Sequence, residues 1–189
     1  KGAAGVVGID CDAHSVETSI SNLKNIFNAS DISDLPVSFC KMDILDADSV
    51  QSLGKFDMVY AWGSLHHTGD MWKSIQNCMQ LVSEGGCFVL AIYNRHFTSP
   101  VWNAIKRIYT YSPRWMQKIW IGLFYPLIYL AKFAITGKNP HQKERGMDFY
   151  YDVIDWVGGY PYEYASPSKI TSFFKKNGFT SRKQIPAQV

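Results

Sequence analysis

The stretch from Phe56 to Trp72, FDMVYAWGSLHHTGDMW, joins a buried strand to a helix through a short polar turn. Its first part, Phe56–Ala61, is mostly apolar, which is typical of a strand covered on both faces. Thr68 and Asp70 are both residue types that cap helices, and they predict a helix that begins near Met71. A strand followed by a helix in this way predicts one repeating unit of an α/β fold.

The same alternation continues on both sides of this stretch. The predicted elements are the strand Val6–Ile9, the helix Ala13–Phe27, the strand Val37–Lys41, a helix that begins near Met71 and ends at Gly85–Gly86, and the strand Cys87–Ile92. Residues 1–94 therefore predict part of a Rossmann-like, mostly parallel sheet with helices on both faces.

The pattern changes after residue 94. Ser99 and Pro100 begin a predicted helix, and Ile119–Ala131 is a run of thirteen residues without a charged or strongly polar side chain. A bilayer span needs about 20 such residues, so residues 95–148 predict a helical insertion or lid that follows the last strand. The alternative is a surface, over residues 115–135, that accepts a lipid-like molecule or touches a membrane as a peripheral contact.

The last part of the chain, residues 149–189, is interpreted as the remainder of the core, with a turn and a final helix. Ser166 and Pro167 begin a final predicted helix that stops at Gly178. The residues from Phe179 onward are interpreted as a further strand.

Composition and charge narrow the class of protein. The formal net charge is +3, and the basic residues are scattered, so nucleic acid is not an expected partner. The four cysteines show no CxxC spacing and are interpreted as free thiols of a reducing cytoplasm. No signal peptide is recognised. We expect a cytoplasmic protein, peripheral at the membrane if the apolar run meets lipid; the sequence does not indicate the oligomeric state.

Two acids follow predicted strands. Asp10 ends the first strand and Asp43 follows the strand Val37–Lys41. Ligands of open α/β sheets bind at the carboxyl ends of the strands, where an acid hydrogen-bonds the ribose of an adenosine cofactor. Asp43 can accept from the adenine amino group while Ile44 packs on the ring. Each acid taken alone also fits a helix cap or a loop. A ribose-binding acid follows its glycine-rich loop by about 20 residues, so we expect that loop and its strand to precede Lys1.

The segment Phe56–Trp72 resembles class I methyltransferases that depend on S-adenosylmethionine (SAM), in a bacterial small-molecule branch similar to the ubiquinone-biosynthesis O-methyltransferases. Leu81–Leu90 and Asp155–Glu163 are similar to further motifs of that branch. The resemblance implies an enzyme, a transferase that moves a methyl group from SAM to an oxygen or nitrogen, less so a carbon, of a small or lipid-like molecule. The glycine-rich first motif and the C-terminal hairpin of the family are absent, so we expect this fragment by itself to be inactive.

The resemblance also implies roles for particular residues. One of the pair His66 and His67 is expected to be the general base, because a histidine titrates near neutral pH; positioning of the acceptor and a purely structural role stay open. The backbone of Ala61, Trp62 and Gly63 is expected along the methionine and ribose part of the cofactor. The residues expected on the acceptor side are Trp156, Tyr160, Tyr162 and Glu163. No metal site is expected, because a lone histidine pair lacks the spacing of metal ligands.

Two other functions fit parts of the sequence. A nicotinamide-dependent oxidoreductase uses the same fold, and fold alone does not decide between the two. The segment around His66 and the absence of a convincing Tyr-x-x-x-Lys motif favour the methyltransferase. The third hypothesis is a non-catalytic protein that binds a partner or a membrane through the hydrophobic region Trp115–Ile135.

Overall fold

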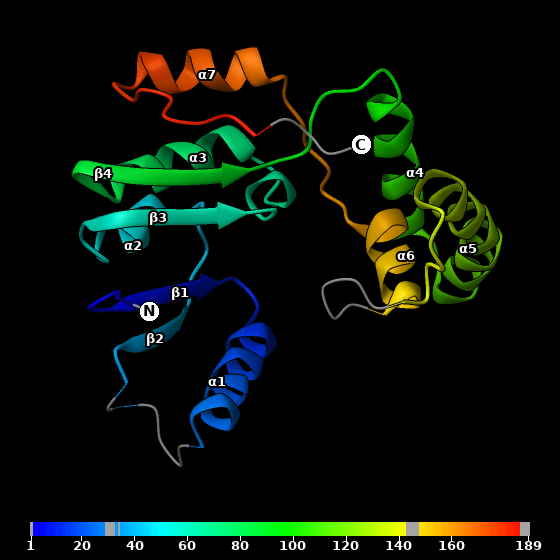
Figure 1. Cartoon of the computed structure of the whole chain (residues 1–189), viewed down its shortest axis with the longest axis horizontal. Coiled ribbons are helices and arrows are strands. Elements are labelled where there is room, and N and C mark those ends of the chain that lie inside the picture. Colours follow the sequence, from blue (N-terminus) through cyan, green and yellow to red (C-terminus); the bar gives the residue numbers. More distant parts are fainter. Residues whose placement is uncertain (1, 29–32, 34, 143–147, 186–189) are drawn as a thin grey trace. The chain divides into compact units, whose positions relative to one another are not determined.

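The chain forms two compact units in the computed structural model, Lys1–Ala91 and Ile92–Val189 (Figure 1). The structure describes residues 2–28, 33, 35–142 and 148–185. The first unit holds the strands together with several helices, and the named elements of the second are all helices. This division follows the change of sequence pattern near residue 94.

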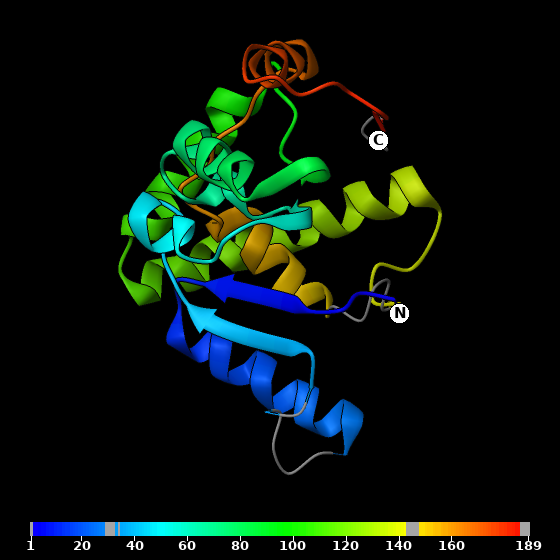
Figure 2. The ribbon, with the colours of Figure 1, turned by 90° about the vertical axis from the view of Figure 1, so that its left-hand side faces the viewer.

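The first unit begins with two parallel strands, β1 (Val6–Asp10) and β2 (Val37–Lys41), paired over their whole length. The helix between them, α1 (Ala13–Phe27), packs along this pair (Figure 2). Its N-cap is Asp12, whose carboxylate accepts a hydrogen bond from the Ser15 N–H at 3.1 Å. The predicted strands and the helix are therefore present at the predicted places.

A second parallel pair follows in the same unit, β3 (Phe56–Trp62) and β4 (Val82–Ala91). The short helix α2 (Ala47–Gln51) precedes β3. A single 3₁₀ turn, η1 (Leu65–His67), and the helix α3 (Met71–Gln80) connect the two strands. Among the described residues no hydrogen-bonded ladder joins β1 to β3.

The prediction that Gly85–Gly86 ends the helix is wrong. The helix α3 stops at Gln80, and the glycine pair lies inside β4. The Phe56 N–H donates to the Leu81 carbonyl at 2.8 Å, so pairing with β3 begins directly after the helix. The register then shifts between Phe56 and Met58, and Gly85 lies in this irregular segment with φ +72°. A positive φ of this kind favours glycine. The glycine pair therefore lies in a bulge of β4 and not at the end of a helix.

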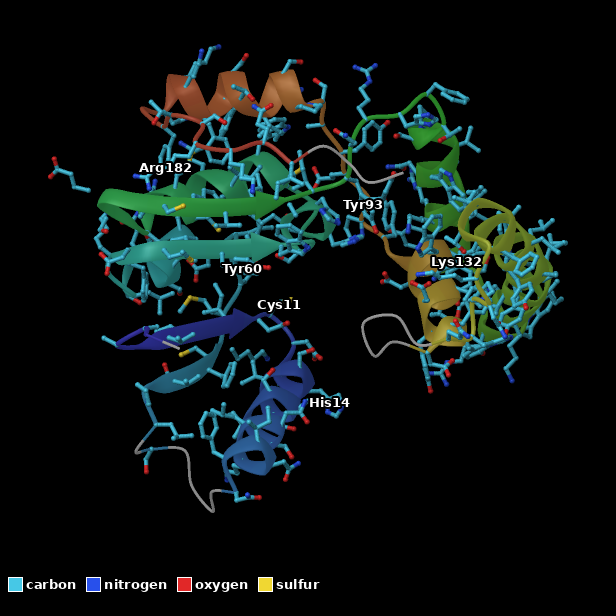
Figure 3. All side chains as sticks on the ribbon, in the orientation of Figure 1. Cys11, His14, Tyr60, Tyr93, Lys132 and Arg182 are labelled. Atoms are coloured by element: carbon cyan, nitrogen blue, oxygen red, sulfur yellow. The ribbon has the colours of Figure 1, made fainter. Side chains whose placement is uncertain are left out.

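The core of the first unit lies under α3. The buried apolar side chains are Val50, Ala61, Leu65, Met71, Ile75, Cys78, Met79 and Leu81. On β3, side chains alternate between the two faces, and Met58, Tyr60 and Trp62 form an exposed face. The rings of Tyr60 and Trp62 are stacked, with their centroids 6.0 Å apart (Tyr60 is labelled in Figure 3).

The second unit is built around three helices, α4 (Ser99–Tyr111), α5 (Arg114–Thr136) and α6 (Phe149–Gly158). Its core joins Ile121 of α5 to Phe149, Val153 and Val157 of α6. The helix α5 continues through Pro126, which lies inside it.

The sequence analysis did not identify α6. The sequence pattern that could have predicted this helix is a capping residue, Asp148, followed by apolar residues four apart. In the structure Asp148 accepts from the Tyr150 N–H at 2.9 Å. Gly158 ends the helix against the Tyr109 ring, where a Cβ would lie 2.8 Å from the ring. A larger residue would force that ring to move.

The last helix, α7 (Pro167–Lys176), has the predicted start. Ser166 caps it by accepting from the Lys169 N–H at 3.3 Å, and Gly178 follows its end with φ +83°. The prediction of a strand from Phe179 is wrong for the described part of that segment, because residues 179–185 form no strand.

Candidate active site

The two acids, Asp10 and Asp43, stand at the carboxyl ends of the neighbouring parallel strands β1 and β2. Asp10 ends β1 opposite Lys41 of β2, and the Met42 N–H donates to the Asp10 carbonyl at 2.8 Å. Asp43 follows directly, and both acids are exposed. Both acids therefore stand at the carboxyl end of the β1–β2 pair, which is where ligands bind in this type of fold.

These two acids do not act as helix caps in the described structure. The caps are their neighbours: Asp12 begins α1 and Asp46 begins α2. Hydrogen bonds from Ser15 lower the pKa of the Asp12 carboxyl, and those from Ser49 lower the pKa of Asp46. From sequence alone Asp10 could have been the cap of α1, but in the structure Asp12 is that cap.

Each strand-end acid is nevertheless held in place. Asp10 Oδ1 accepts from the Asp12 N–H at 2.8 Å, and Asp43 Oδ1 accepts from the Leu45 N–H at 2.9 Å. Each contact engages one carboxylate oxygen and fixes its direction. Because both side chains are also exposed, they can accept further hydrogen bonds from a ligand.

The loop after β2 is attached to α3 by a residue that the sequence analysis missed. The Asn77 Nδ2 donates to the Ile44 carbonyl at 2.7 Å, and Asn77 is only 4% exposed. Its sequence signal is a polar side chain between the apolar Ile75 and Cys78 on a helix face. A buried polar group is normally hydrogen-bonded, and here that bond positions Ile44.

The end of β3 turns sharply at Gly63. Ala61 is buried, Trp62 is exposed, and Gly63 has φ +77°. The Gly63 N–H donates to the Ala91 carbonyl of β4 at 3.0 Å. A side chain other than glycine is strained at this φ, so the chain can leave the sheet here and continue into η1.

The histidine pair lies on η1, and its two rings differ in environment. His66 is 3% exposed, whereas His67 is half-buried. Their ring centroids are 4.3 Å apart, and the rings are tilted by 59°. Thus the two neighbours do not offer the same access to an incoming molecule.

A small hydroxyl network holds the turn that carries the histidines. The Thr68 hydroxyl donates to the Leu65 carbonyl at 2.8 Å and accepts from the Ser74 hydroxyl at 2.8 Å. Ser74 is fully buried on α3. Thr68 therefore braces the turn, while Asp70 is the N-cap of α3 and accepts from the Lys73 N–H at 3.1 Å.

The residues expected on the acceptor side belong to the second unit, whereas the histidines belong to the first. Trp156 is exposed on α6, Tyr160 and Glu163 are half-buried, and Tyr162 is buried. The Tyr162 ring lies 5.0 Å from that of Tyr93. Burial raises the pKa of the Tyr162 hydroxyl, and its packing makes it part of the unit's interior.

A buried lysine, also missed from sequence, packs on Tyr162. Lys106 is 3% exposed; its Nζ lies 5.3 Å from the centroid of the Tyr162 ring and donates to the Asp155 carbonyl at 3.2 Å. Asn103 Nδ2 donates to the Tyr162 carbonyl at 2.7 Å. Burial lowers the pKa of Lys106 to about 8, against the opposing effect of Asp155. This cluster connects α4 to the end of α6 and the segment after it.

Two other features lie outside the site. A surface hollow of about 310 Å³, lined by Gln51, Gly54, Lys55 and Gln80, is near the start of β3 and not at the carboxyl ends of the strands. Within the described ranges, no group of three His, Cys, Asp or Glu side chains is placed to hold a metal ion.

Parallel strands with acids at neighbouring carboxyl ends define an α/β protein of the type that binds adenosine cofactors. Residues 1–142 match the family described as "Methyltransferase domain", and the chain belongs to this family. The predicted methyltransferase class is therefore confirmed, and the match favours it over the oxidoreductase alternative.

One solved structure resembles the chain, that of PKMT2 from Rickettsia typhi in complex with AdoHcy. The TM-score is 0.57 at 16% identity, over 92% of this chain and 34% of that chain. The likeness confirms the predicted Rossmann-like α/β fold, and this chain spans about a third of the length of that protein. No curated protein matches the chain. The likeness to the ubiquinone-biosynthesis branch stays a prediction.

Proposed function

We propose that this protein transfers a methyl group from SAM to an oxygen or nitrogen atom of a small or lipid-like acceptor. The observation that carries the proposal is the pair of exposed acids, Asp10 and Asp43, at the carboxyl ends of the paired parallel strands β1 and β2, whose pairing continues into the Met42 N–H to Asp10 carbonyl bond of 2.8 Å. Membership in the methyltransferase family supports it, as does the AdoHcy bound to the structural neighbour.

The residues at the strand ends fit the parts of SAM. The Asp10 carboxylate is exposed and fixed by the Asp12 N–H, so it can accept from both ribose hydroxyls. Asp43 would accept from the adenine amino group, and Ile44, whose carbonyl accepts from Asn77 Nδ2, would pack on the ring. The backbone from Ala61 to Gly63 approaches the methionine part, because Gly63 carries no side chain in the way.

Bound SAM supplies a methyl group on a positively charged sulfur, and the reaction is an in-line displacement by the acceptor. Most of the rate enhancement then comes from alignment of the acceptor and the methyl group. The remaining task is removal of the proton from the acceptor O–H or N–H. A histidine ring nitrogen near neutral pH suits this task.

Of the two histidines, His67 is the better general base. A base has to reach the acceptor within hydrogen-bond distance, and His67 is half-buried, whereas His66 is 3% exposed. His66 packs against His67 at 4.3 Å and orients it. Trp156, Tyr160 and Glu163 contribute to the acceptor side, with Tyr162 supporting them from the interior of the second unit.

Cofactor binding is tested by calorimetric titration of the full-length protein with AdoHcy. Asp10→Ala is expected to weaken binding about tenfold or more, because a charge-assisted hydrogen bond contributes about 1.5–3 kcal/mol. Asp57→Ala is the matched control. Asp57 is an exposed acid near the amino-terminal end of β3, away from the carboxyl ends of the strands, and it accepts from the Ser83 hydroxyl at 3.2 Å. Equal affinity of the Asp10→Ala variant and the wild type would contradict the cofactor assignment.

The base is tested by turnover with SAM and a panel of phenols, amines and carboxylates. His67→Ala is expected to lower kcat about 100-fold or more, the range of general base catalysis. His66→Ala is expected to lower stability more than kcat. If both variants keep wild-type turnover, neither histidine is the base.

We also propose a cytoplasmic location. All four cysteines, Cys11, Cys40, Cys78 and Cys87, are free thiols, which suits a reducing compartment. Fractionation of cells that express a tagged protein tests this. Recovery of the protein outside the cytoplasmic side of the membrane would contradict it.

A further inference from the structure

The helix α5 presents an apolar face to solvent. Its exposed large side chains include Trp115, Ile119, Leu123, Leu127 and Leu130, each 55 to 63% exposed. They recur every three or four residues, so at 3.6 residues per turn they lie within an arc of about 120° on one side of the helix. The structure describes all of α5, and its three charged residues, Arg114, Lys118 and Lys132, lie outside that arc. We refer to this arc as the outer face.

The opposite side of α5 packs against the rest of the second unit. Ile121 lies in the core with Val153 and Val157 of α6. Lys132 Nζ forms an ion pair with Asp152 of α6 at 3.0 Å (Lys132 is labelled in Figure 3). Surrounding α5 with lipid on all sides would expose this core and break the ion pair. The helix is therefore suited to lie in a membrane interface with only its outer face in contact with lipid.

By length and composition alone, α5 could cross a membrane. The core helix of a soluble protein passes the same test, but such a helix is mostly buried, and only 6% of the apolar window of α5 is buried. Large exposed apolar patches on a protein mark sites of interaction with partners, ligands or membranes. The outer face is thus expected to be covered by a binding partner or by lipid.

Charge indicates which occupant fits. From Gly85 to Gln142 the sequence holds no Asp or Glu, although the whole chain has 16 acidic residues in 189. In this region Lys106 donates to the Asp155 carbonyl and Lys132 pairs with Asp152, whereas Arg107 of α4 and Arg114 and Lys118, in the first two turns of α5, are exposed. A second copy of the chain would place cations against cations across a symmetric contact. An anionic lipid surface instead satisfies both the cations and the apolar side chains.

We propose that the outer face of α5 docks in the plane of an anionic bilayer, with Arg114 and Lys118 at the level of the headgroups. The helix α4, which packs on α5, also carries exposed apolar side chains, Val101, Ile108 and Tyr111. Lys and Arg can extend their side chains along apolar surface while the charge stays in water. This surface does not depend on methyl transfer, so the two proposals succeed or fail separately.

The test is flotation of the full-length protein with phosphatidylcholine vesicles and with vesicles of equal parts phosphatidylcholine and phosphatidylglycerol. Binding is expected to the second kind and to weaken as salt is added. The double variant Leu123→Ser/Leu127→Ser is expected to lower binding about tenfold or more, from the loss of two leucines that enter the lipid. The matched control, Ile26→Ser/Phe27→Ser, removes two comparably exposed apolar side chains of α1 and is expected to change binding less than about twofold.

The charge part is tested by Arg114→Gln/Lys118→Gln. This variant is expected to lose binding to the phosphatidylglycerol vesicles about 25-fold, since each of the two cations contributes about a fivefold change in affinity. Quenching by brominated lipid gives a readout that needs no destabilising variant: the quenched tryptophan signal is expected to fall in Trp115→Phe.

Four results would overturn the proposal. The wild-type protein does not float with either kind of vesicle, or the α1 control loses as much binding as the α5 variant. The protein resists extraction from membranes by alkaline carbonate, which indicates a spanning helix. Light scattering without lipid shows a dimer that Leu123→Ser/Leu127→Ser dissociates, which indicates that a second copy covers the outer face.

Discussion

Asn77→Ala is the most direct test of how the first unit positions its candidate cofactor loop. Asn77 is 4% exposed on α3, and its Nδ2 donates to the Ile44 carbonyl at 2.7 Å. The substitution removes the donor and leaves a carbonyl without that partner. Loss of one partner of a buried hydrogen bond costs about 1–3 kcal/mol. We therefore expect the free energy of unfolding to fall by about 2 kcal/mol.

A second consequence concerns binding. Without the Asn77 bond, the loop that contains Asp43 and Ile44 is held by fewer contacts and has to be ordered when the cofactor binds. A cost of about 1 kcal/mol for that ordering corresponds to about a fivefold rise in the Kd for AdoHcy. Binding and stability are thus expected to change together, although Asn77 touches no ligand in the proposed site.

The matched control is Gln80→Ala on the same helix. The Gln51 Nε2 donates to Gln80 Oε1 at 2.7 Å, but both side chains are exposed. Exposed substitutions of this kind usually change stability by less than about 0.5 kcal/mol. The comparison therefore isolates the effect of burial on two hydrogen bonds of equal length.

The assay is urea unfolding of both variants, with calorimetric titration of AdoHcy in the full-length protein. A shift of the midpoint at constant slope reports stability. If Asn77→Ala and Gln80→Ala cost the same, the reasoning from burial is refuted. If Asn77→Ala is destabilised but binds AdoHcy like the wild type, the Ile44 loop does not form part of the cofactor site.

Three further results are expected. Burial lowers the pKa of Lys106 from 10.5 to about 8, so between these pH values the unfolded chain binds more protons than the folded protein. The free energy of unfolding of the wild type should therefore rise from pH 7.5 to 9.5 relative to that of Lys106→Met. Urea midpoints of the two proteins that run parallel over this range would contradict this. Burial raises the pKa of Cys78 to about 12, so iodoacetamide at pH 8 should modify the exposed Cys11 well before Cys78, as followed by peptide mass spectrometry. Ile75→Ala, at a fully buried position of α3, should lower the free energy of unfolding by about 2–5 kcal/mol in urea unfolding; a loss below 1 kcal/mol would refute its place in the core.

Much of the first unit could be predicted from local sequence patterns. The bounds of α1 and β2 agree with the prediction, because the spacing of apolar residues and the caps act over one or two turns of chain. The acids Asp10 and Asp43 could be placed at strand ends for the same reason. In the second unit, Ser166 correctly marked the start of α7.

Other local signals were ambiguous, and long-range pairing decided them. Gly85 and Gly86 have the composition of a helix end, yet pairing of β4 with β3 draws them into a strand. Asp10 and Asp12 are both suitable caps, and only the geometry of α1 assigns that role to Asp12. A residue's own neighbours in the sequence carry no information about which of two such roles the distant strand or helix selects.

The sequence alone established the order of the strands and of the helices α1 and α3 in the first unit, the strand-end acids and the histidine turn, because these depend on neighbours a few residues away. Tertiary packing decided what each of these side chains faces. It buried His66 while leaving His67 partly open, tied Asn77 to Ile44 across 33 residues, and left one side of α5 uncovered. Burial and hydrogen-bond partners depend on contacts between segments far apart in the chain, and no periodicity within a single segment specifies them.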